Sequence, residues 1–395
     1  MNWQAGIILL GWLIGGAILA GGAGPDSPAP PSPTDGPWRP AEPGYRWEFP
    51  RDFGRHPQYK TEWWYVTGHL FPEDADQSEA EALAFQMTFF RVGLVPEATE
   101  LPASAWAASD LVMAHASVAD PAHGTHRFSE VLQRATPFLG GFGNPTDTTL
   151  AWCQAPAGTV GKWKIVRSGE GFRLLASDDR QGFGYDLTCT PLRAPVFHGT
   201  DGFSPKSRDG KTGSLYFSFT RLAVRGTVTV GDRQIAVRGQ SWLDREIFSN
   251  SLAPDQKGWD WVSLQLDDGR DLMLYRLKGR SASSDFALGT LVAADGTSRT
   301  LPAEEWSLRP VDRWKSPETG SEYPILWRLQ VPGEGIDLEL KAVMPNQENV
   351  STRSEIHYWE GAVTAQPVGP GASQKIQGRG FVELTGYGKG SRPPV

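Results

Sequence analysis

The amino-acid sequence predicts an all-β protein whose strands are divided between two domains. The chain holds 45 Gly and 31 Pro, which mark turns, together with 16 Trp, 18 Phe and 9 Tyr, which favour strands. Apolar residues recur at every second position in several segments, which is the period of a half-buried strand. At 395 residues the chain is also longer than one ordinary hydrophobic core supports. We therefore expect many short strands joined by tight turns.

The first 44 residues are predicted to lie outside this fold. Residues 5–23 are apolar and uncharged and end in small residues, which is typical of a signal peptide over residues 1–23 with Gly21 and Ala23 near its cleavage site. The segment is also close to the roughly 20 residues that span a bilayer, so an uncleaved membrane anchor is the alternative. Residues 24–44 are rich in proline and predict an extended linker. The expected location is periplasmic or secreted, membrane-anchored if residues 5–23 are retained.

Alternating apolar residues and Gly-containing turn pairs predict individual strands and hairpins. The clearest strand segments are residues 83–89, 215–219, 228–230, 235–237 and 336–343. The turn pairs that predict tight hairpins are Gly231-Asp232, Asp268-Gly269 and Asp295-Gly296. These patterns fit a sandwich and closed barrels equally well.

A polar, turn-rich stretch at residues 249–257 separates two strongly patterned halves of the chain. It predicts an N-terminal domain over residues 45–249 and a C-terminal domain over residues 250–390. The sequence holds two cysteines, Cys153 and Cys189. In an oxidising compartment they could form one disulfide, and as buried thiols they could equally pack as small apolar residues.

Several function classes are disfavoured by the composition and by the motifs that are missing. The net charge of −7 argues against nucleic acid as a partner, because phosphate binding needs a basic surface. No Gly-rich phosphate loop opens a helix, and no Gly-x-Ser-x-Gly nucleophile elbow occurs. His123 and His126 form a His-x-x-His pattern in a Gly-containing turn, which is too weak a signal to predict a metal site. We therefore expect no metal and no cofactor.

Several motifs spread along the chain carry a resemblance to a known family. They are residues 62–65 (Glu-Trp-Trp-Tyr), 67–70, 114–116, 241–246, 258–261 (Gly-Trp-Asp-Trp) and 382–387. Over residues 45–388 the sequence resembles the AttH-like family, which is related to carotenoid 1,2-hydratase. The resemblance implies two lipocalin-like β-barrels in tandem. It also implies an activity, because characterised members add water to an isoprenoid double bond, while other relatives accompany export-type ABC transporters.

Hydration of an alkene needs an acid that is neutral near pH 7, aromatic faces that stabilise the cation, and a water. Asp244 falls on the family's proposed catalytic Asp, and Trp242, two residues earlier, is expected on the same face of one strand. His69 and His115 are further acid–base candidates. The family's hydratases carry a His and a Trp about 28 residues before the Asp, and residues 214–221 of this chain contain neither. Trp242 also replaces their Tyr.

The carboxylates of these motifs could also have purely structural roles. Asp244 could pair with the adjoining Arg245 or with another cation outside any pocket. Asp260 lies between two Trp residues and is expected to face away from both rings, as an ion-pair or hydrogen-bond partner. Glu62 is expected to be a buried carboxylate that ties the first strand to Arg91 or Arg221.

Three hypotheses of function follow. The first is an exported binding protein that holds a long apolar molecule, an isoprenoid or a lipid, and that works with an ABC transporter. The second is a carotenoid 1,2-hydratase-like enzyme, and the third is a structural module with filled barrels. Binding is favoured because the chain is rich in aromatic residues and lacks the His–Trp pair. The expected ligand-binding residues are Trp63, Trp64, Tyr65, Trp259 and Trp261.

Overall fold

The computed structural model describes most of the chain beyond the proline-rich segment. The described residues are 38–75, 82–96, 99–250, 252–253, 255–281, 284–353, 356–368 and 376–388. The expected signal peptide or anchor over residues 1–23 lies outside the described residues, as does most of the expected linker. Within the described ranges, no helix has the length and apolar character needed to cross a membrane.

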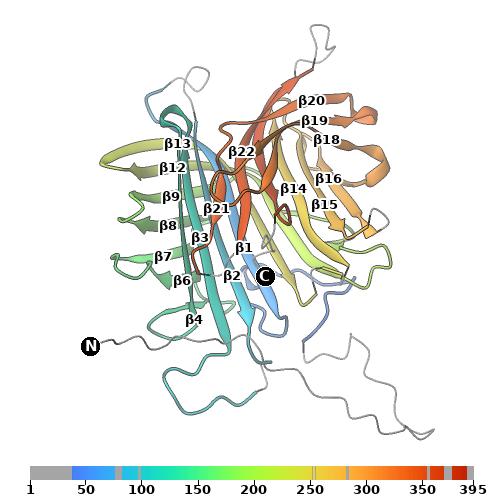
Figure 1. Ribbon diagram of the computed structural model, residues 1–395. Coiled ribbons are helices and arrows are strands. Elements are labelled where there is room, and N and C mark those ends of the chain that lie inside the picture. The colour runs from blue at the N-terminus through green and yellow to red at the C-terminus, as the bar shows by residue number, and fades with distance from the viewer. Residues whose placement is uncertain are drawn as a thin grey trace, which may run out of the picture. The chain divides into compact units, whose positions relative to one another are not determined.

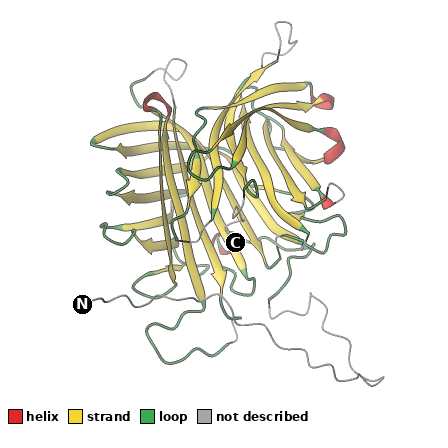
Figure 2. Cartoon of the chain, in the orientation of Figure 1, coloured by secondary structure: helices red, strands yellow, loops and turns green. Residues whose placement is uncertain are grey.

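Nearly all regular secondary structure in the described chain is β-strand, and the strands are joined by turns and loops (Figures 1 and 2). The strands of the first sheet are β1 (Thr61–Pro72), β2 (Leu83–Gly93), β3 (Asp110–Asp120), β4 (Thr125–Arg134), β5 (Gly140–Phe142), β6 (Thr149–Gln154), β7 (Lys162–Ser168), β8 (Gly171–Asp178), β9 (Phe183–Pro191), β10 (Val196–Phe197), β11 (Phe203–Pro205), β12 (Gly213–Val230) and β13 (Arg233–Phe248). Those of the second sheet are β14 (Gln256–Leu266), β15 (Asp271–Gly279), β16 (Phe286–Val292), β17 (Ser298–Pro302), β18 (Ser307–Lys315), β19 (Glu322–Val331), β20 (Ile336–Ala342), β21 (Glu348–Val350), β22 (His357–Pro367) and β23 (Gly378–Leu384). Short 3-10 turns occur at η1 (Arg51–Phe53), η2 (Pro121–His123), η4 (Ala303–Glu305) and η5 (Pro332–Glu334).

Each sheet is antiparallel and curls towards a barrel. The first runs in the order β4-β3-β2-β1-β13-β12-β9-β8-β7-β6-β5, with β10 and β11 paired to β12. The second runs β17-β16-β15-β14-β23-β22-β20-β19-β18, with β21 paired to β22. The all-β, lipocalin-like prediction is confirmed: two curled, nearly closed sheets account for the fold.

The interior of each curled sheet is filled by alternating apolar side chains. The first core includes Trp64, Val66, Phe85, Met87, Phe89, Phe217, Phe219 and Leu243. The second includes Val262, Leu264, Leu274, Leu338, Leu340, Val363 and Val382. The predicted alternation over residues 83–89, 215–219 and 336–342 is therefore correct, since the apolar positions of these segments face a core.

The predicted hairpins are also present. Val230 pairs with Arg233 across the two-residue turn at Gly231-Asp232. β14 and β15 are joined through Asp268-Gly269, and Gly269 has a φ of +90°. An L-residue adopts this φ only with strain, which explains the glycine.

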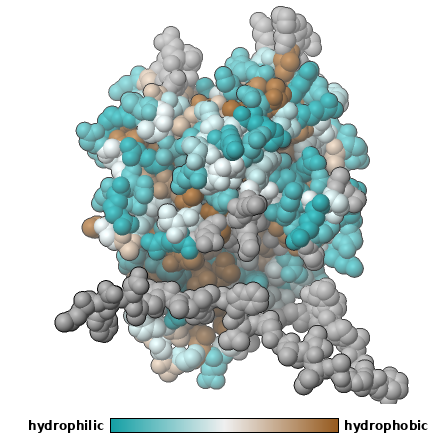
Figure 3. All heavy atoms as spheres, viewed as in Figure 1, coloured by the Kyte–Doolittle hydropathy of each residue, from teal (hydrophilic) through white to brown (hydrophobic). Residues whose placement is uncertain are grey.

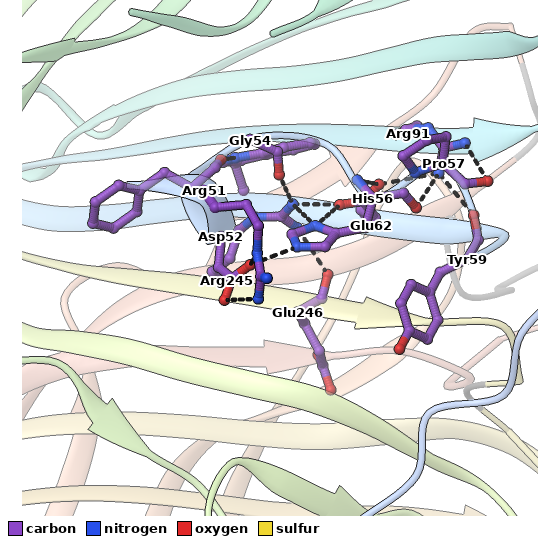
Figure 4. A network of polar contacts seen from close by, with 12 residues as sticks. Arg51, Asp52, Gly54, His56, Pro57, Tyr59, Glu62, Arg91, Arg245 and Glu246 are labelled. Carbon is purple, nitrogen blue, oxygen red and sulfur yellow. Dashed lines mark hydrogen bonds and ion pairs between the residues drawn. The ribbon is translucent and has the colours of Figure 1, made fainter. Parts of the chain in front are cut away.

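A buried network of charges lies on the core side of β1 and β13 (Figure 4). Glu62 accepts hydrogen bonds from Arg91 (3.0 Å), from Arg245, and from the backbone N–H of His56 (2.7 Å). Arg245 also lies over the Trp64 ring, with its guanidinium carbon 3.8 Å from the ring centroid. The expected contact of Glu62 with Arg91 is found. The alternative contact with Arg221 was wrong, because that residue pairs with Asp271 in the second sheet.

Cys153 and Cys189 are free, buried thiols. The disulfide considered for them is not formed, and the sheet order gives the reason. Cys153 lies on β6 and Cys189 on β9, with β8 and β7 between them. Strands lie about 4.8 Å apart, and a disulfide requires Cα atoms within about 7 Å, so two intervening strands hold the thiols out of reach.

Candidate functional site

The two curled sheets pack against each other through the outer faces of their central strands. Residues that alternate with the core residues of β1, β12 and β13 meet the corresponding residues of β14, β15, β22 and β23. The largest members of this shared cluster are Tyr65, Tyr216, Trp242, Trp259, Trp261, Tyr275 and Phe381. Figure 1 shows β1 of the first sheet beside β22 of the second. The outward view in Figure 3 is mostly hydrophilic, with smaller apolar areas.

A pocket lies within this shared face and is lined from both sheets. It contains about 690 Å³ of space free of atoms, its open mouth included. The centre of a water molecule can occupy about 60 Å³ of it. One buried water needs about 10–15 Å³, so several waters or a short apolar group fit. Aromatic rings form much of the lining, and carboxyl groups enter from both sheets.

Asp244 lines this pocket from the middle of β13 and is only 5% exposed. It pairs with Tyr65 of β1 on one side and with Ser218 of β12 on the other. Trp242 shares its face, as the alternation predicts, and the indole Nε1–H donates a 2.6 Å hydrogen bond to Asp244 Oδ1. The two residues therefore act as one unit at the boundary of the two sheets.

The Asp244 carboxyl has no ionic partner among the residues that the structure describes. Burial raises its pKa to about 7, and the hydrogen bonds from Ser218, Trp242 and Tyr216 oppose that rise. The alternative in which Asp244 pairs with Arg245 was wrong. Alternation turns Arg245 to the other face of β13, where it binds Glu62.

Three residues that the sequence analysis did not single out complete the surroundings of Asp244. Tyr216 donates a 2.7 Å hydrogen bond to Asp244 Oδ2 and accepts one of 3.1 Å from the Trp261 indole. Ser218 donates to Asp244 Oδ1, and His198 Nε2 lies 2.6 Å from the Ser218 oxygen. Burial lowers the pKa of His198 to about 3, which keeps the ring neutral.

Tyr216 and Ser218 occupy the stretch in which the related hydratases carry their His and Trp. Their alternation with three core residues, Leu215, Phe217 and Phe219, was the available signal that they share one face. His198 comes from the segment after β10, outside any patterned strand. The sequence offered no signal that would bring it to Ser218.

A second charged group, Glu246, lies on the same face of β13. It accepts hydrogen bonds from the Trp63 indole (2.7 Å) and from Ser214, and it forms a 2.8 Å ion pair with Lys206. The Lys206 ammonium also lies 4.1 Å from the centroid of the Tyr275 ring. Burial opposes the charge on Lys206, but the carboxylate of Glu246 outweighs it and raises the Lys206 pKa.

Two further carboxyl groups reach the shared face from the second sheet. Glu360 on β22 and Glu383 on β23 are direct neighbours across the strand pair. Tyr65 donates a 2.7 Å hydrogen bond to Glu360 Oε1 across the two sheets. Burial raises the pKa of Glu383 to about 7 and raises that of Glu360 well above its ordinary value.

The two expected histidine candidates lie near the pocket but do not line it. His115 Nδ1 is 2.7 Å from the hydroxyl of Tyr358, which does line it. His69 Nε2 is bonded to the Gly380 carbonyl oxygen at 3.0 Å. Burial lowers the pKa of His115 to about 3 and that of His69 to about 4, so neither ring carries charge near neutral pH.

Four of the five aromatic residues expected to bind a ligand line the pocket, namely Trp63, Tyr65, Trp259 and Trp261. Trp64 does not, because it points into the core of the first sheet and stacks on Phe142 with ring centroids 5.3 Å apart. The expected orientation of Asp260 is found. It faces away from both Trp rings and binds Lys278 at 2.9 Å.

Across the described ranges, no group of three or more His, Cys, Asp or Glu side chains is arranged to hold a metal ion. The two histidines of the weak His123–His126 motif bind different partners. His123 binds Asp120 at 3.0 Å, whereas His126 Nε2 lies 2.8 Å from Asn349 Oδ1 of the second sheet.

The arrangement can move protons inside an aromatic enclosure. An acid with a pKa near 7 is able both to donate and to accept a proton at neutral pH. The faces of neighbouring Trp and Tyr rings stabilise positive charge that develops on carbon. Waters fit beside an apolar group in the same pocket.

The chain is similar to several known proteins over most of its length. A crystal structure assigned to AttH from Nitrosomonas europaea has a TM-score of 0.73 and 32% identity, covering 88% of this chain and 99% of that one. Kievitone hydratase from Nectria haematococca has a TM-score of 0.60 at 16% identity, covering 83% of this chain and 90% of that one, and shows the fold alone. The dehydratase asqC of Emericella nidulans is 23% identical over 237 residues, which span 55% of this chain and 65% of the dehydratase.

The family model that describes AttH-like proteins matches residues 40–387, which include both curled sheets and the whole pocket. This match and the Nitrosomonas europaea structure agree with each other. The protein therefore belongs to the AttH-like family.

Proposed function

We propose that this protein is a hydro-lyase that adds water to, or removes water from, a carbon–carbon double bond of an apolar molecule, an isoprenoid in our proposal. One observation carries the proposal. Asp244 is a buried carboxyl without an ionic partner in the described chain, with a pKa near 7, at the wall of an aromatic pocket. The hydratase and dehydratase among the similar proteins support the same reaction class.

In the hydration direction, neutral Asp244 gives its proton to one carbon of the double bond. The neighbouring carbon becomes cationic, and the rings of Trp259 and Trp261, which line the pocket with Asp244, supply the faces that stabilise it. A water adds its oxygen to that carbon and releases one proton to a base. The products are the alcohol and ionised Asp244, and dehydration is the same path reversed. Ser218 and the Trp242 indole orient the carboxyl by binding Oδ1.

The test is turnover in H₂¹⁸O with geraniol, farnesol and geranylacetone and with the corresponding tertiary alcohols, followed by mass spectrometry. Asp244→Asn keeps the shape of the side chain but removes the acid. We expect it to lower kcat by about 10²–10⁴-fold, the usual contribution of a general acid.

Asp260→Asn is the matched control, because Asp260 lies on β14 between two pocket Trp residues but faces away from the pocket. It should retain the wild-type rate. Full activity in Asp244→Asn, or no turnover of the panel by the wild type, would refute the proposal.

A second candidate function is binding without chemistry. The aromatic lining and the open mouth of the pocket favour it. In that case Asp244→Asn should bind the same isoprenoids with unchanged affinity and neither protein should turn them over. Titration of tryptophan fluorescence reports this directly, since Trp63, Trp259 and Trp261 line the pocket.

Export and a transporter partner remain proposals from the sequence. They rest on the apolar residues 5–23 and on the family resemblance. Fractionation of the native host, with the protein located by antibody, tests the expected periplasmic or secreted location.

A further inference from the structure

The proposed hydration leaves one question open, namely which group receives the proton of the attacking water. Asp244 is ionised once it has given its proton to carbon, and it can take a proton back only from a water on its own side of the substrate. A water that attacks from the opposite side needs a second base, which must reach it from the second sheet. Three other carboxyl groups are close, those of Glu246, Glu360 and Glu383.

Glu246 is poorly suited to this role. Its two oxygens already accept hydrogen bonds from Trp63 and Ser214, and Lys206 pairs with it at 2.8 Å. These donors stabilise the charge of the carboxylate and occupy the lone pairs that a base would use.

The remaining two carboxyls form a pair on the second sheet. Glu360 and Glu383 lie directly opposite each other on β22 and β23, and their side chains share the face that meets the first sheet. Directly opposed residues have Cβ atoms about 4.5–5.5 Å apart, a distance at which two like charges destabilise a sheet. Glu360 is 2% exposed, Tyr65 binds its Oε1, and its Oε2 has no hydrogen-bond partner among the residues that the structure describes.

We propose that Glu360 and Glu383 hold one proton between them, and that Glu383 is the base that takes the proton of the attacking water. This inference rests on the proposed function. Glu383 is the member that lines the pocket, while Glu360 lies behind it and is a positioning residue. Asp244 approaches from the first sheet and Glu383 from the second, so the substrate lies between acid and base.

This placement predicts the stereochemistry of the reaction. Asp244 delivers a proton from the first sheet, and Glu383 directs the water oxygen to the neighbouring carbon from the second sheet. Hydrogen and hydroxyl therefore add to opposite faces of the double bond. Afterwards Asp244 is ionised and Glu383 is protonated, and solvent returns one proton to Asp244 and removes one from Glu383.

The charged and titratable groups that surround Glu383 come from both sheets, and β14, which pairs with β23, turns its Asp260 away from the pocket. The surrounding groups are Asp244 and Glu246 on β13, Tyr65 on β1, Tyr216 on β12, Lys206 after β11, Tyr275 on β15, and Tyr358 and Glu360 on β22. The mutual repulsion of the carboxyls favours the neutral forms, and Lys206 is already neutralised by Glu246. One ionised carboxylate in the pair is therefore the expected state near pH 7.

An infrared titration of the unliganded wild-type protein tests the shared proton without any substrate. We expect a protonated carboxyl band to persist well above pH 7 and to disappear in Glu360→Gln. In Glu383→Gln the same band should titrate at lower pH, because the like charge next to Glu360 is gone. Glu339→Gln is the control, since Glu339 is an exposed residue on β20. If the band titrated at the same pH in Glu383→Gln as in the wild type, the proposal that the two carboxyls share one proton would be wrong.

Turnover of the isoprenoid panel in D₂O tests the role of Glu383. We expect deuterium and hydroxyl in anti relation at the internal double bond of geranylacetone, and a loss of kcat of about 10²–10⁴-fold in Glu383→Gln. Syn addition, or an unchanged rate in Glu383→Gln, would overturn the role as base. Absence of turnover in the wild type would overturn that role together with the proposed function, while the infrared titration would still decide whether the proton is shared.

Discussion

The hydroxyl of Tyr216 is one of three donors that hold the ionised form of Asp244. Tyr216→Phe removes this donor and should raise the pKa of Asp244 above 7. A hydrogen bond to a charged group is worth about 1.5–3 kcal/mol, and one pKa unit corresponds to about 1.4 kcal/mol, so we expect a rise of about one to two units. The acid then stays protonated to higher pH, and the alkaline limb of the plot of kcat against pH shifts to higher pH.

The pH dependence of turnover measures this shift. Tyr323→Phe is a suitable control, since Tyr323 is a buried Tyr that binds Glu348 in the second sheet, away from the pocket. An alkaline limb that stays in place or moves to lower pH in Tyr216→Phe would show that the Tyr216 hydroxyl does not stabilise the ionised Asp244.

Individual residues of the site were predictable only where a local pattern placed them. Trp242 and Asp244 are two positions apart in one strand, so alternation alone put them on one face. Glu383 lies within a motif that supported the family resemblance, yet nothing local marked it as a pocket residue. Its position depends on the pairing of β23 with β14 and β22, and pairing between distant strands cannot be read from one strand.

At the scale of elements, β1 shows how a strand serves two functions with its two faces. Its even-numbered residues Glu62, Trp64 and Val66 enter the first core, and its odd-numbered residues Trp63 and Tyr65 line the pocket. The alternation of strands was predictable, because a period of two is visible in the sequence. The burial of both faces of β1 was not predictable, because the outer face is buried only by the second sheet.

Glu62→Gln should weaken the core side of β1 strongly. The substitution leaves Arg245 buried without the carboxylate that it binds, while Arg91 keeps its ion pair with Asp110, and breaking a buried ion pair costs about 3–5 kcal/mol. We expect the free energy of unfolding in urea to fall by this amount. Asp337→Asn removes an exposed ion pair with Arg328 and should cost about 0–1 kcal/mol. Equal losses of the free energy of unfolding in the two variants would show that the buried ion pairs stabilise the fold no more than an exposed one.

The same network predicts how stability depends on acid. Burial alone would raise the pKa of Asp52, but hydrogen bonds from His56 and Arg51 outweigh it and lower the pKa to about 2. A lowered folded-state pKa gives stability that is complete above the ordinary value near 4 and is lost as the pH falls towards 2. We expect the melting temperature to drop steeply over this interval in the wild type and less steeply in Asp52→Asn, as measured by calorimetry. An equal drop in both proteins would contradict this assignment.

The order of the strands predicts the state of the two cysteines. Burial raises the pKa of Cys189 to about 12 and that of Cys153 further above its ordinary value, so neither thiolate is available. Iodoacetamide should leave the native protein unlabelled and should label both cysteines in denaturant without a reducing agent, as read by mass spectrometry. A protein that labels in denaturant only after reduction would contain the disulfide that the sheet order excludes.

At the scale of the whole molecule, the pocket exists only where the two sheets meet. Hydrogen bonds cross between the sheets from Tyr65 to Glu360 and from Trp261 to Tyr216. Each sheet has its own filled core, and neither core contributes the pocket. This arrangement differs from a lipocalin that holds its ligand inside one barrel. It also explains why motifs far apart in the sequence lie in one site.

Because the pocket depends on this contact, a charge placed within it should separate the sheets before it unfolds them. Ala362 on β22 is fully buried in the shared cluster, close in sequence to Glu360. Ala362→Asp would bury another carboxyl there, at a cost of several kcal/mol. We expect one calorimetric transition in the wild type and two in Ala362→Asp, because each sheet retains its own core. Ala122→Asp, at an exposed turn, should keep the single transition. A single transition in Ala362→Asp would show that the sheets unfold together without help from the shared face.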